Sequence, residues 1–409
     1  MSTSLLYHAW DLVGYSYHSS TYKDGAVQFC FSVQDKRLRC PECGSADVIR
    51  KGCKTRTFRG CPIGATPVWL TVPIPRVECK ACRIVRQIRL GFAAPDREHT
   101  RQFARYVLSL LRLGTIQDVA RHLGVSWDTV KDIQRQHLKA RYGNPVLGGL
   151  RHIAIDEIYI GRKGGYLTLV LDLDTGAIMH AGKGKGGDAL KRFWKKLRRS
   201  GATIQAVAID MSKAYVAAVR EHLPGAALVF DHFHVVKLFN EKLTELRRDL
   251  HREATGPLQK NVLKGTRWLL LRNAENLDQT RKGRRRSERE RLEEALRLNQ
   301  PLATAYYLKE ELGELWNQSD RAAAERYLDG WLERAEGAGI RILTSMAKTL
   351  RAYRDGLLNY YDYPISTGPL EGTNNKIRTM QRQAYGYRDH EFFCLKLFAL
   401  HESRYALVG

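Results

Sequence analysis

The order of expected strands and helices between residues 150 and 234 constrains the fold of this chain more than any other feature. The segment HIAIDEIYI predicts one strand, and GYLTLVLDLDTGAIMHAGKG predicts two more around a turn at Asp174-Thr175-Gly176. DALKRFWKKLRRS then has the spacing of an amphipathic helix, and a strand, a helix and a strand follow it. Three antiparallel strands followed by this alternation predict one mixed sheet with helices packed on it.

Two aspartates lie in this segment at positions that such a sheet can bring together. The order of elements is that of the ribonuclease-H-like fold, with Asp156 on the first strand and Asp210 at the end of the fourth. Two carboxylates held close together repel each other, so their natural use is to hold divalent cations. Carboxylate oxygens suit Mg²⁺ or Mn²⁺, and the sequence therefore predicts a metal site at these two residues.

Glu371, in the segment TGPLEGTNNKIR, is the candidate for the third carboxylate that completes a two-metal site. It follows the helical block 235–362, which is too long to be a loop and is therefore predicted to be an insertion domain. Pro369 suits the first helical position, which would make Glu371 the third residue, near the positive end of the helix dipole. A glutamate that only starts a helix is the alternative interpretation.

The helix predicted around Glu371 carries further polar residues on the same face, because positions three or four apart lie on one side of a helix. These residues are Asn375, Arg378 and Arg382. A carboxylate for a metal ion, followed by basic groups for phosphate, is what cleavage of a DNA backbone would use. We therefore expect these three side chains to contact DNA.

Four cysteines form two C-x-x-C pairs, Cys40 with Cys43 and Cys79 with Cys82. Each such turn points two thiolates at one point, and two turns complete a tetrahedral Zn²⁺ site. Between the pairs, PVWLTVPIPRVEC alternates as the strands of a small ribbon would. The prediction is a structural zinc ribbon over residues 37–95, with reduced core cysteines or a redox pair as the alternatives.

The segment IQDVARHLGVSWDTVKDIQRQ predicts a helix-turn-helix, in which Gly124 breaks the first helix and Ser126 caps the second. An upstream helix near 101–113 would complete the unit. The face of the second helix expected to be exposed carries Trp127, Asp128, Lys131, Gln134 and Arg135. Of these, Trp127, Lys131 and Arg135 are predicted to contact DNA in the major groove. An ordinary helical hairpin is the alternative.

Asp231, His232 and His234, in DHFHVVK, are further candidate metal ligands. Imidazole is a poor ligand for Mg²⁺, so a structural or water-positioning role is favoured for His234. Glu157 follows Asp156 on the same strand and is expected to point to the opposite face of the sheet.

The predicted insertion contains three tryptophans and a run of charge. Trp268, Trp316 and Trp331 are expected in its core, with stacking of one of them on a displaced base as the alternative. The run RKGRRRSERERLEEALRL from Arg281 is expected to be a solvated helix face, whose basic half could also follow phosphates.

The charge balance favours a polyanionic partner. The chain has 67 Lys and Arg against 43 Asp and Glu, a net charge of +24, and a soluble chain this basic most often meets nucleic acid. No apolar run reaches the ~18 residues that span a bilayer, and no signal peptide is recognised. We therefore expect a cytoplasmic, nucleoid-associated protein with no membrane partner.

At these motifs the sequence resembles a known family. AIDE, AIDMSKAY, DHFHVVKLFN, TGPLEGTNNKIR and QAYGYRD look like bacterial insertion-sequence transposases of the DDE class, most closely the ISL-three-like group. The resemblance covers almost the whole chain from about Cys40. It implies an acidic triad that binds Mg²⁺ and cuts DNA at the ends of the element, and by position this triad is Asp156, Asp210 and Glu371.

The expected architecture is multidomain α/β, with a ribonuclease-H-like catalytic domain interrupted by an all-helical insertion. The parts are an N-terminal arm (1–36), a zinc ribbon (37–95), a helix-turn-helix domain (96–145), the first part of the catalytic domain (150–234), the insertion (235–362) and the C-terminal catalytic helices (363–409).

The expected function is that of a DNA transposase, acting as a homodimer on double-stranded DNA. It would bind the terminal inverted repeats, cleave the backbone with two Mg²⁺ ions and transfer the 3′-OH strand to target DNA. A related nuclease or recombinase and an inactive, transposase-derived regulator are the alternatives.

Overall fold

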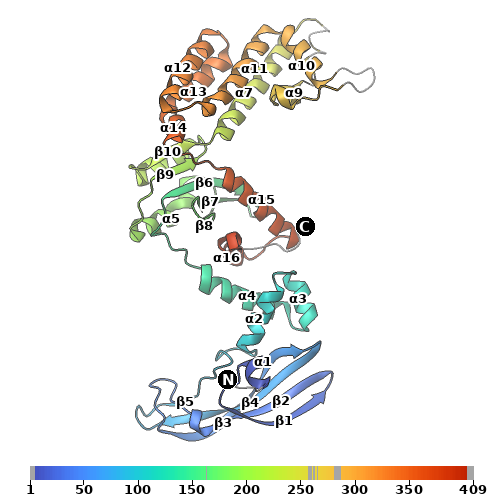
Figure 1. Cartoon of the computed structure of the whole chain (residues 1–409), viewed down its shortest axis with the longest axis vertical. Helices are drawn as coiled ribbons and strands as arrows, with labels where there is room; N and C mark the ends of the chain where they lie inside the picture. Colours follow the sequence, from blue (N-terminus) through green and yellow to red (C-terminus); the bar gives the residue numbers. More distant parts are fainter. Residues whose placement is uncertain are drawn as a thin grey trace. The chain divides into compact units, whose positions relative to one another are not determined.

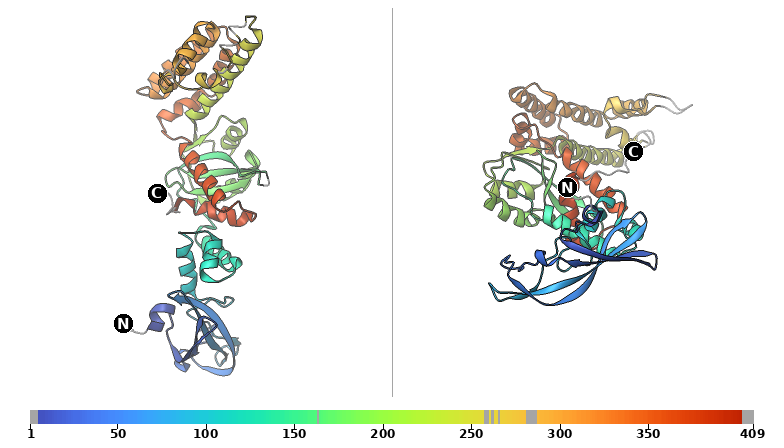
Figure 2. Two further views of the ribbon diagram at one scale, coloured as in Figure 1. Left: turned by 90° about the vertical axis from the view of Figure 1, so that its right-hand side faces the viewer. Right: turned by 60° about the horizontal axis from the view of Figure 1, so that its bottom comes forward.

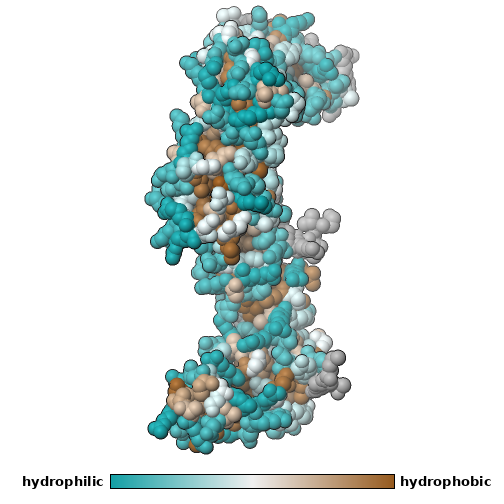
Figure 3. Space-filling view, turned by 60° about the vertical axis from the view of Figure 1, so that its left-hand side comes forward, coloured by the Kyte–Doolittle hydropathy of each residue, from teal (hydrophilic) through white to brown (hydrophobic). Residues whose placement is uncertain are grey.

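The structure is a computed structural model that describes residues 5–162, 164–256, 260, 263–264, 266–280 and 287–402. The chain divides into two compact units, Met1–Arg141 with Glu402–Gly409, and Tyr142–His401 (Figure 1, Figure 2). The face drawn in Figure 3 is mostly hydrophilic, with scattered apolar patches. Among the helices that the structure describes, none is long and apolar enough to cross a bilayer.

The first unit contains a five-stranded sheet in the order β1-β2-β4-β3, with β5 paired to β4. Its strands are β1 (Tyr15–Lys23), β2 (Ala26–Val33), β3 (Val48–Ile63), β4 (Thr66–Cys79) and β5 (Val85–Gln87). Residues 1–36, predicted as an arm, contribute α1 (Leu5–Trp10), β1 and β2 to this domain. Trp10 and Phe31 from this segment share one core with Phe58 and Leu70 of the β3–β4 hairpin. β1 is polar and mostly exposed, so its sequence lacks the apolar alternation of a buried strand.

Three helices follow in the first unit: α2 (Arg101–Leu110), α3 (Ile116–Leu123) and α4 (Trp127–Tyr142). Thr115 and Asp118 form a capping box at the start of α3, and Gly124 ends it in the left-handed conformation (φ 60°). The Ser126 hydroxyl accepts a hydrogen bond from the Thr129 amide (3.1 Å), as expected of the N-cap of α4. One apolar core joins the three helices, and the predicted trihelical unit is confirmed.

The second unit is built on a sheet in the order β10-β9-β6-β7-β8. The strands are β6 (His152–Tyr159), β7 (Tyr166–Asp172), β8 (Ile178–Lys183), β9 (Ala206–Ile209) and β10 (Ala227–Phe230). β6, β7 and β8 pair antiparallel, whereas β6, β9 and β10 run parallel. The helices packed against the sheet are α5 (Gly187–Ser200), α6 (Lys213–His222), α15 (Gly368–Gln383) and α16 (His390–Phe398).

A run of helices separates β10 from α15 (Figure 1). They are α7 (His232–Glu253), α9 (Arg267–Leu270), α10 (Glu288–Arg297), α11 (Gln300–Gly313), α12 (Arg321–Gly337), α13 (Arg341–Ala352) and α14 (Arg354–Leu358). Trp331 is buried and donates its indole N–H to the Leu308 carbonyl (2.9 Å), as expected of a core residue. Trp316 packs partly buried against the same core, but Trp268 is 65% exposed, so its core assignment is wrong. Residues 281–286, the basic half of the run from Arg281, lie outside the described residues.

Candidate functional site

Asp156 and Asp210 are brought together by the pairing of two parallel strands. Ala154 of β6 lies opposite Ala208 of β9, and continuing this register by two residues places Asp156 opposite Asp210. Asp210 follows the last residue of β9, and its Oδ1 accepts a hydrogen bond from the Ser212 amide (3.0 Å). The Asp210 charge is close enough to influence Asp156, and a shared metal site at the two residues stays a prediction.

The surroundings of Asp156 disfavour its charged form. Burial raises the pKa of Asp156, and the nearby charge of Asp210 acts in the same direction. His234, from α7, and a hydrogen bond from Asn374, from α15, oppose this rise. A carboxylate that is buried beside a second carboxylate is suited to a divalent cation, which relieves both penalties at once.

Asn374 was missed by the sequence reasoning, which selected Asn375. Its Nδ2 donates to Asp156 Oδ2 (3.1 Å), and its side chain is only 7% exposed. Its carbonyl oxygen Oδ1 is buried and has no hydrogen-bond partner in the described part of the chain. The signal was the double asparagine in TGPLEGTNNKIR: the first faces the sheet, and the second faces away from it.

Glu371 lies in the first turn of α15, which packs against β6. The helix begins at Gly368, so Pro369 is its second residue and Glu371 its fourth, one position later than predicted. Glu371 is exposed, as are the three residues predicted to share its face, Asn375, Arg378 and Arg382. Arg378 donates to the Asn375 side-chain oxygen (3.4 Å), so these two side chains lie on the same face of α15.

The three predicted carboxylates do not form one tight ligand group. Across the described residues, the only group of three or more His, Cys, Asp or Glu side chains close enough to share one ion is the cysteine cluster. The charge of Asp210 acts on Asp156, and Glu371 is exposed in the first turn of its helix. Carboxylate oxygens are nevertheless the ligands that Mg²⁺ and Mn²⁺ prefer. The buried Asn374 Oδ1, which accepts no hydrogen bond in the described part of the chain, is a further oxygen beside Asp156.

Asp231 holds the start of α15 to the end of β10. Its Oδ1 accepts from the Phe233 amide (2.8 Å), and its Oδ2 accepts from the Thr367 amide (2.8 Å) and from the Thr367 hydroxyl. The side chain is 3% exposed, so these bonds satisfy a buried charge. Both carboxylate oxygens accept hydrogen bonds from the protein, which argues against Asp231 as a metal ligand. Asp231, in the DHFH segment, instead holds the start of α15, the helix that carries Glu371.

We expect Asp231→Asn to reduce, about tenfold or more, the DNA cleavage that the family resemblance implies for this site. The amide has one acceptor oxygen where the carboxylate has two, so its N–H₂ would face either the Thr367 donors or the Phe233 amide. A buried group would be left unsatisfied at a cost of ~1–3 kcal/mol, and the link between β10 and the start of α15 should loosen. Asp172→Asn is the matched control, because Asp172 is also buried but holds the turn after β7 through Asp174 and Thr175. Equal cleavage by the two variants at similar melting temperatures would remove the positioning role.

The four predicted zinc ligands meet at one point. Their Sγ atoms all lie within 4.8 Å of one another, with 3.5 Å between Cys40 and Cys82 and between Cys43 and Cys79. A tetrahedral ion with Zn–S bonds of ~2.3 Å requires sulfur separations of about 3.8 Å, so the arrangement fits zinc. The hydrogen bond from the Cys43 amide is the main cause that lowers the pKa of the Cys40 thiol to about 6, whereas the thiols of Cys79 and Cys40 raise the pKa of Cys43.

The exposed face of α4 differs from the prediction at one residue. Trp127 is 42% exposed, and the Lys131 ammonium lies 4.9 Å from its ring centroid. Gln134, expected on this face, is buried at 8% exposure, because it lies one turn beyond the core residue Val130. Arg135 is half-buried. Contact of Trp127, Lys131 and Arg135 with DNA stays a prediction.

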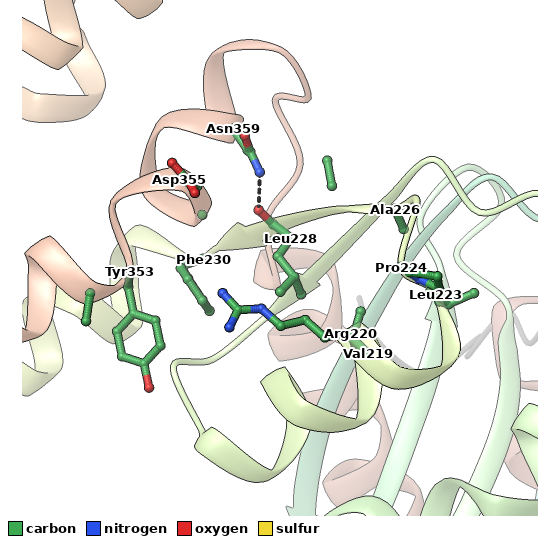
Figure 4. A pocket seen from close by; sticks show the side chains of 13 residues that line it. Val219, Arg220, Leu223, Pro224, Ala226, Leu228, Phe230, Tyr353, Asp355 and Asn359 are labelled. Carbon is green, nitrogen blue, oxygen red and sulfur yellow. Dashed lines mark hydrogen bonds between the residues drawn. The ribbon is translucent and has the colours of Figure 1, made fainter.

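A pocket of about 190 Å³ lies where the helical segment returns to the sheet, between α6, β10 and α14 (Figure 4). Asn359 donates to the Leu228 carbonyl (2.9 Å), and the Tyr353 ring meets the Phe230 ring edge-on at 5.0 Å. A Cβ on Gly356 would lie 2.2 Å from the Phe230 ring, so only glycine allows this approach. The lining residues include none of the three predicted carboxylates.

Three protein-family models match successive segments of the chain. A transposase family model of the DDE type, ISL3 group, matches residues 153–397, and a helix-turn-helix domain of transposase family ISL3 matches residues 88–138. A zinc-finger model of the transposases of IS204, IS1001, IS1096 and IS1165 matches residues 36–82. The chain belongs to the ISL3 transposase family. The resemblance noted in the sequence is confirmed.

Two individual relatives are also transposases of insertion sequence elements. The chain is 35% identical over 367 residues to the transposase for insertion sequence element IS1001 of Bordetella parapertussis, covering 89% of each chain. It is 28% identical over 397 residues to the transposase for element IS1557 of Mycobacterium tuberculosis, covering 91% of this ISL3 transposase and 87% of the relative. Among solved structures, the Drosophila P element transposase strand transfer complex has a TM-score of 0.39 and 11% identity, covering 75% and 92% of the two chains.

Proposed function

We propose that this ISL3 transposase cuts DNA at the terminal inverted repeats of an insertion sequence and transfers the freed 3′-OH strand to target DNA. The observation that carries the proposal is the parallel pairing of β6 with β9, which ends at Ala154 and Ala208, two residues before Asp156 and Asp210. The contact of α15, the helix that bears Glu371, with β6 supports it further. The strand order β10-β9-β6-β7-β8 supports a ribonuclease-H-like catalytic domain, with residues 235–362 as a helical insertion.

Different residues of this chain are proposed to bind metal, to orient the metal ligands and to contact phosphate during strand cleavage. Asp156, Asp210 and Glu371 would hold two Mg²⁺ or Mn²⁺ ions, which when bound activate water and stabilise the charge of the transferring phosphate. Asn374 orients the Asp156 carboxylate through its hydrogen bond, and Asp231 fixes the start of α15 through Thr367. Arg378 and Arg382, on the exposed face of α15, would neutralise the phosphate backbone near the cut.

A cleavage assay on the element's own end, with and without Mg²⁺, tests this function. We expect cuts at the end of the repeat only when Mg²⁺ is present, followed by joining to a second duplex. Cutting without preference for the repeat would favour a related nuclease or recombinase. Binding to the repeat without cutting under either condition would favour a transposase-derived regulator.

The N-terminal domains are proposed to recognise the repeat, with the four-cysteine ribbon held by a structural zinc ion. In this arrangement α4 enters the major groove and presents Trp127, Lys131 and Arg135 to the bases. Four thiolate ligands leave no open position for water, so the zinc supports folding and takes no part in cleavage. Action on chromosomal DNA would place the protein at the nucleoid.

Lys131→Ala should weaken binding to the terminal repeat about fivefold or more, and binding to random DNA much less, because a base contact carries the specificity. Lys139→Ala is the matched control, since Lys139 is an exposed lysine two turns further along α4. Competition binding at several salt concentrations measures the affinity for the terminal repeat and the affinity for random DNA. Both variants should lower the salt dependence of binding only slightly. Equal losses on the two DNAs would show that Lys131 contacts phosphate alone.

Two subunits are expected to act together, because two element ends must be cut and joined in one event. Light scattering of the protein bound to element ends should give the mass of two chains with two DNA ends. A complex with one chain and two ends would contradict the proposed dimer.

A further inference from the structure

The helical segment carries an exposed tryptophan that the proposed cleavage chemistry does not use. Trp268, in α9, is the most exposed of the seven tryptophans at 65%, whereas its neighbours Leu269 and Leu270 are buried. An indole ring on the surface gives up the large stabilisation that its burial would provide. We propose that Trp268, together with Arg248 and Arg267, forms a binding site for single-stranded DNA, with the indole stacked on an unpaired base.

Positive charge is concentrated beside this ring. The Arg267 guanidinium lies 4.9 Å from the Trp268 ring centroid. Arg247 on α7 is close enough to Arg248 and Arg267 that their charges, after burial, lower its pKa. Arg248 and Arg267 are exposed, and within the described ranges no carboxylate lies at ion-pair distance from either. Unpaired cations that repel one another are complementary to a polyanion.

The short helix that bears Trp268 is held from both sides. On the α11 side, buried Lys309 donates from Nζ to the Arg272 carbonyl (3.0 Å), and the Tyr306 hydroxyl donates to the same oxygen (3.3 Å). On the α7 side, Arg247 donates to the Leu263 carbonyl (3.0 Å). These hydrogen bonds hold the backbone before and after α9, so the position of the Trp268 backbone is fixed by α7 and α11.

An aromatic face beside cationic groups matches the chemistry of single-stranded nucleic acid. Stacking requires a base whose face is free, and in a duplex the base faces are covered by their neighbours, so an unpaired strand is the occupant that uses both the ring and the charges. The inference rests on the proposed function, because cutting and joining DNA exposes unpaired strands. It adds a contact on the helical segment that is separate from repeat recognition by α4.

Photo-crosslinking of the full-length protein to oligothymidylate containing 5-iodouracil tests the proposal. Irradiation followed by peptide mass spectrometry should identify a crosslink at Trp268, and fluorescence anisotropy should show binding weakened about tenfold by Trp268→Ala. Trp268→Phe should retain most of the affinity, because it keeps an aromatic face. Tyr307→Ala is the matched control, since Tyr307 is an exposed aromatic residue on α11.

Three results would overturn the proposal: unchanged affinity in Trp268→Ala, equal affinity for an abasic oligomer, or crosslinks confined to residues outside α9. Equal affinity of the abasic oligomer would mean that only phosphate is bound. The assay contains no element end and requires no cleavage, so its failure leaves the proposed transposase function intact. Failure of end cleavage with retained crosslinking at Trp268 would instead reject the transposase mechanism and keep the single-strand site.

Discussion

Glu371→Gln should lower DNA cleavage at least about a hundredfold and leave binding to the terminal repeat nearly unchanged. The amide keeps the size of the side chain but removes the negative charge that would hold Mg²⁺, and loss of one stabilising group in such a site costs on the order of 10²–10³ in rate. Asp156→Asn and Asp210→Asn should behave alike. Recognition is proposed to lie in the N-terminal domains, which these substitutions do not touch.

Glu391→Gln provides the matched control for Glu371. Glu391 is an exposed glutamate in the first turn of α16, where its interaction with the helix dipole contributes ~0.3–1 kcal/mol, and it is not one of the three predicted metal ligands. Rates of end cleavage and affinities for the repeat are compared for both variants and the unaltered protein. Cleavage by Glu371→Gln at the rate of Glu391→Gln would return Glu371 to the role of a helix start and leave the third carboxylate unidentified.

The choice of metal ion gives a second measurement on the same site. Mn²⁺ should support cleavage, because its size and preference for oxygen ligands resemble those of Mg²⁺. Ca²⁺ should permit DNA binding without cutting, since its longer bonds and variable coordination do not reproduce the tight geometry. Equal cleavage rates in Ca²⁺ and Mg²⁺ would contradict a two-ion mechanism of this kind.

Local patterns explain why much of the fold could be predicted. Gly124 in the left-handed conformation and Ser126 at the N-cap of α4 act within a few residues, so the turn between two helices can be read directly from the sequence. The position of Asp210 at the end of β9 follows equally from an apolar run that ends at a carboxylate. Parallel pairing of β6 with β9, which ends at Ala154 and Ala208, is consistent with the expectation that Asp156 and Asp210 are neighbours.

The parts that were missed depend on how distant segments pack. Spacing along α15 groups Asn375 with Glu371, but the face that meets β6 is decided by the sheet and selects Asn374. Asp231 and Thr367 are 136 positions apart, so no local pattern reveals their hydrogen bonds. Gln134 is buried because the neighbouring helices cover it, although its polar side chain favoured an exposed position.

Cys79→Ser is expected to remove zinc from the protein and to unfold the end of the first sheet. Cys79 is the last residue of β4 and is fully buried, and its thiol lies 3.5 Å from that of Cys43, whose turn is far away in sequence. In small zinc domains, the apparent free energy of metal binding is ~10–16 kcal/mol and supplies the folding free energy. Here part of the sheet has its own apolar core around Phe58 and Leu70, so the loss should be largest near the two cysteine turns.

Elemental analysis and thermal melting measure this prediction, with Cys53→Ser as the matched control. Cys53 is an exposed cysteine of the same hairpin and lies outside the four-thiol group. We expect about one zinc ion per chain in the unaltered protein and in Cys53→Ser, and little or none in Cys79→Ser. Binding to the terminal repeat should fall together with the zinc content, because β3 supports α3 through a buried hydrogen bond from Arg59 to the Leu123 carbonyl (2.7 Å). If Cys79→Ser kept the zinc content and melting behaviour of Cys53→Ser, the four thiols would not be metal ligands, and their proximity would reflect core packing alone.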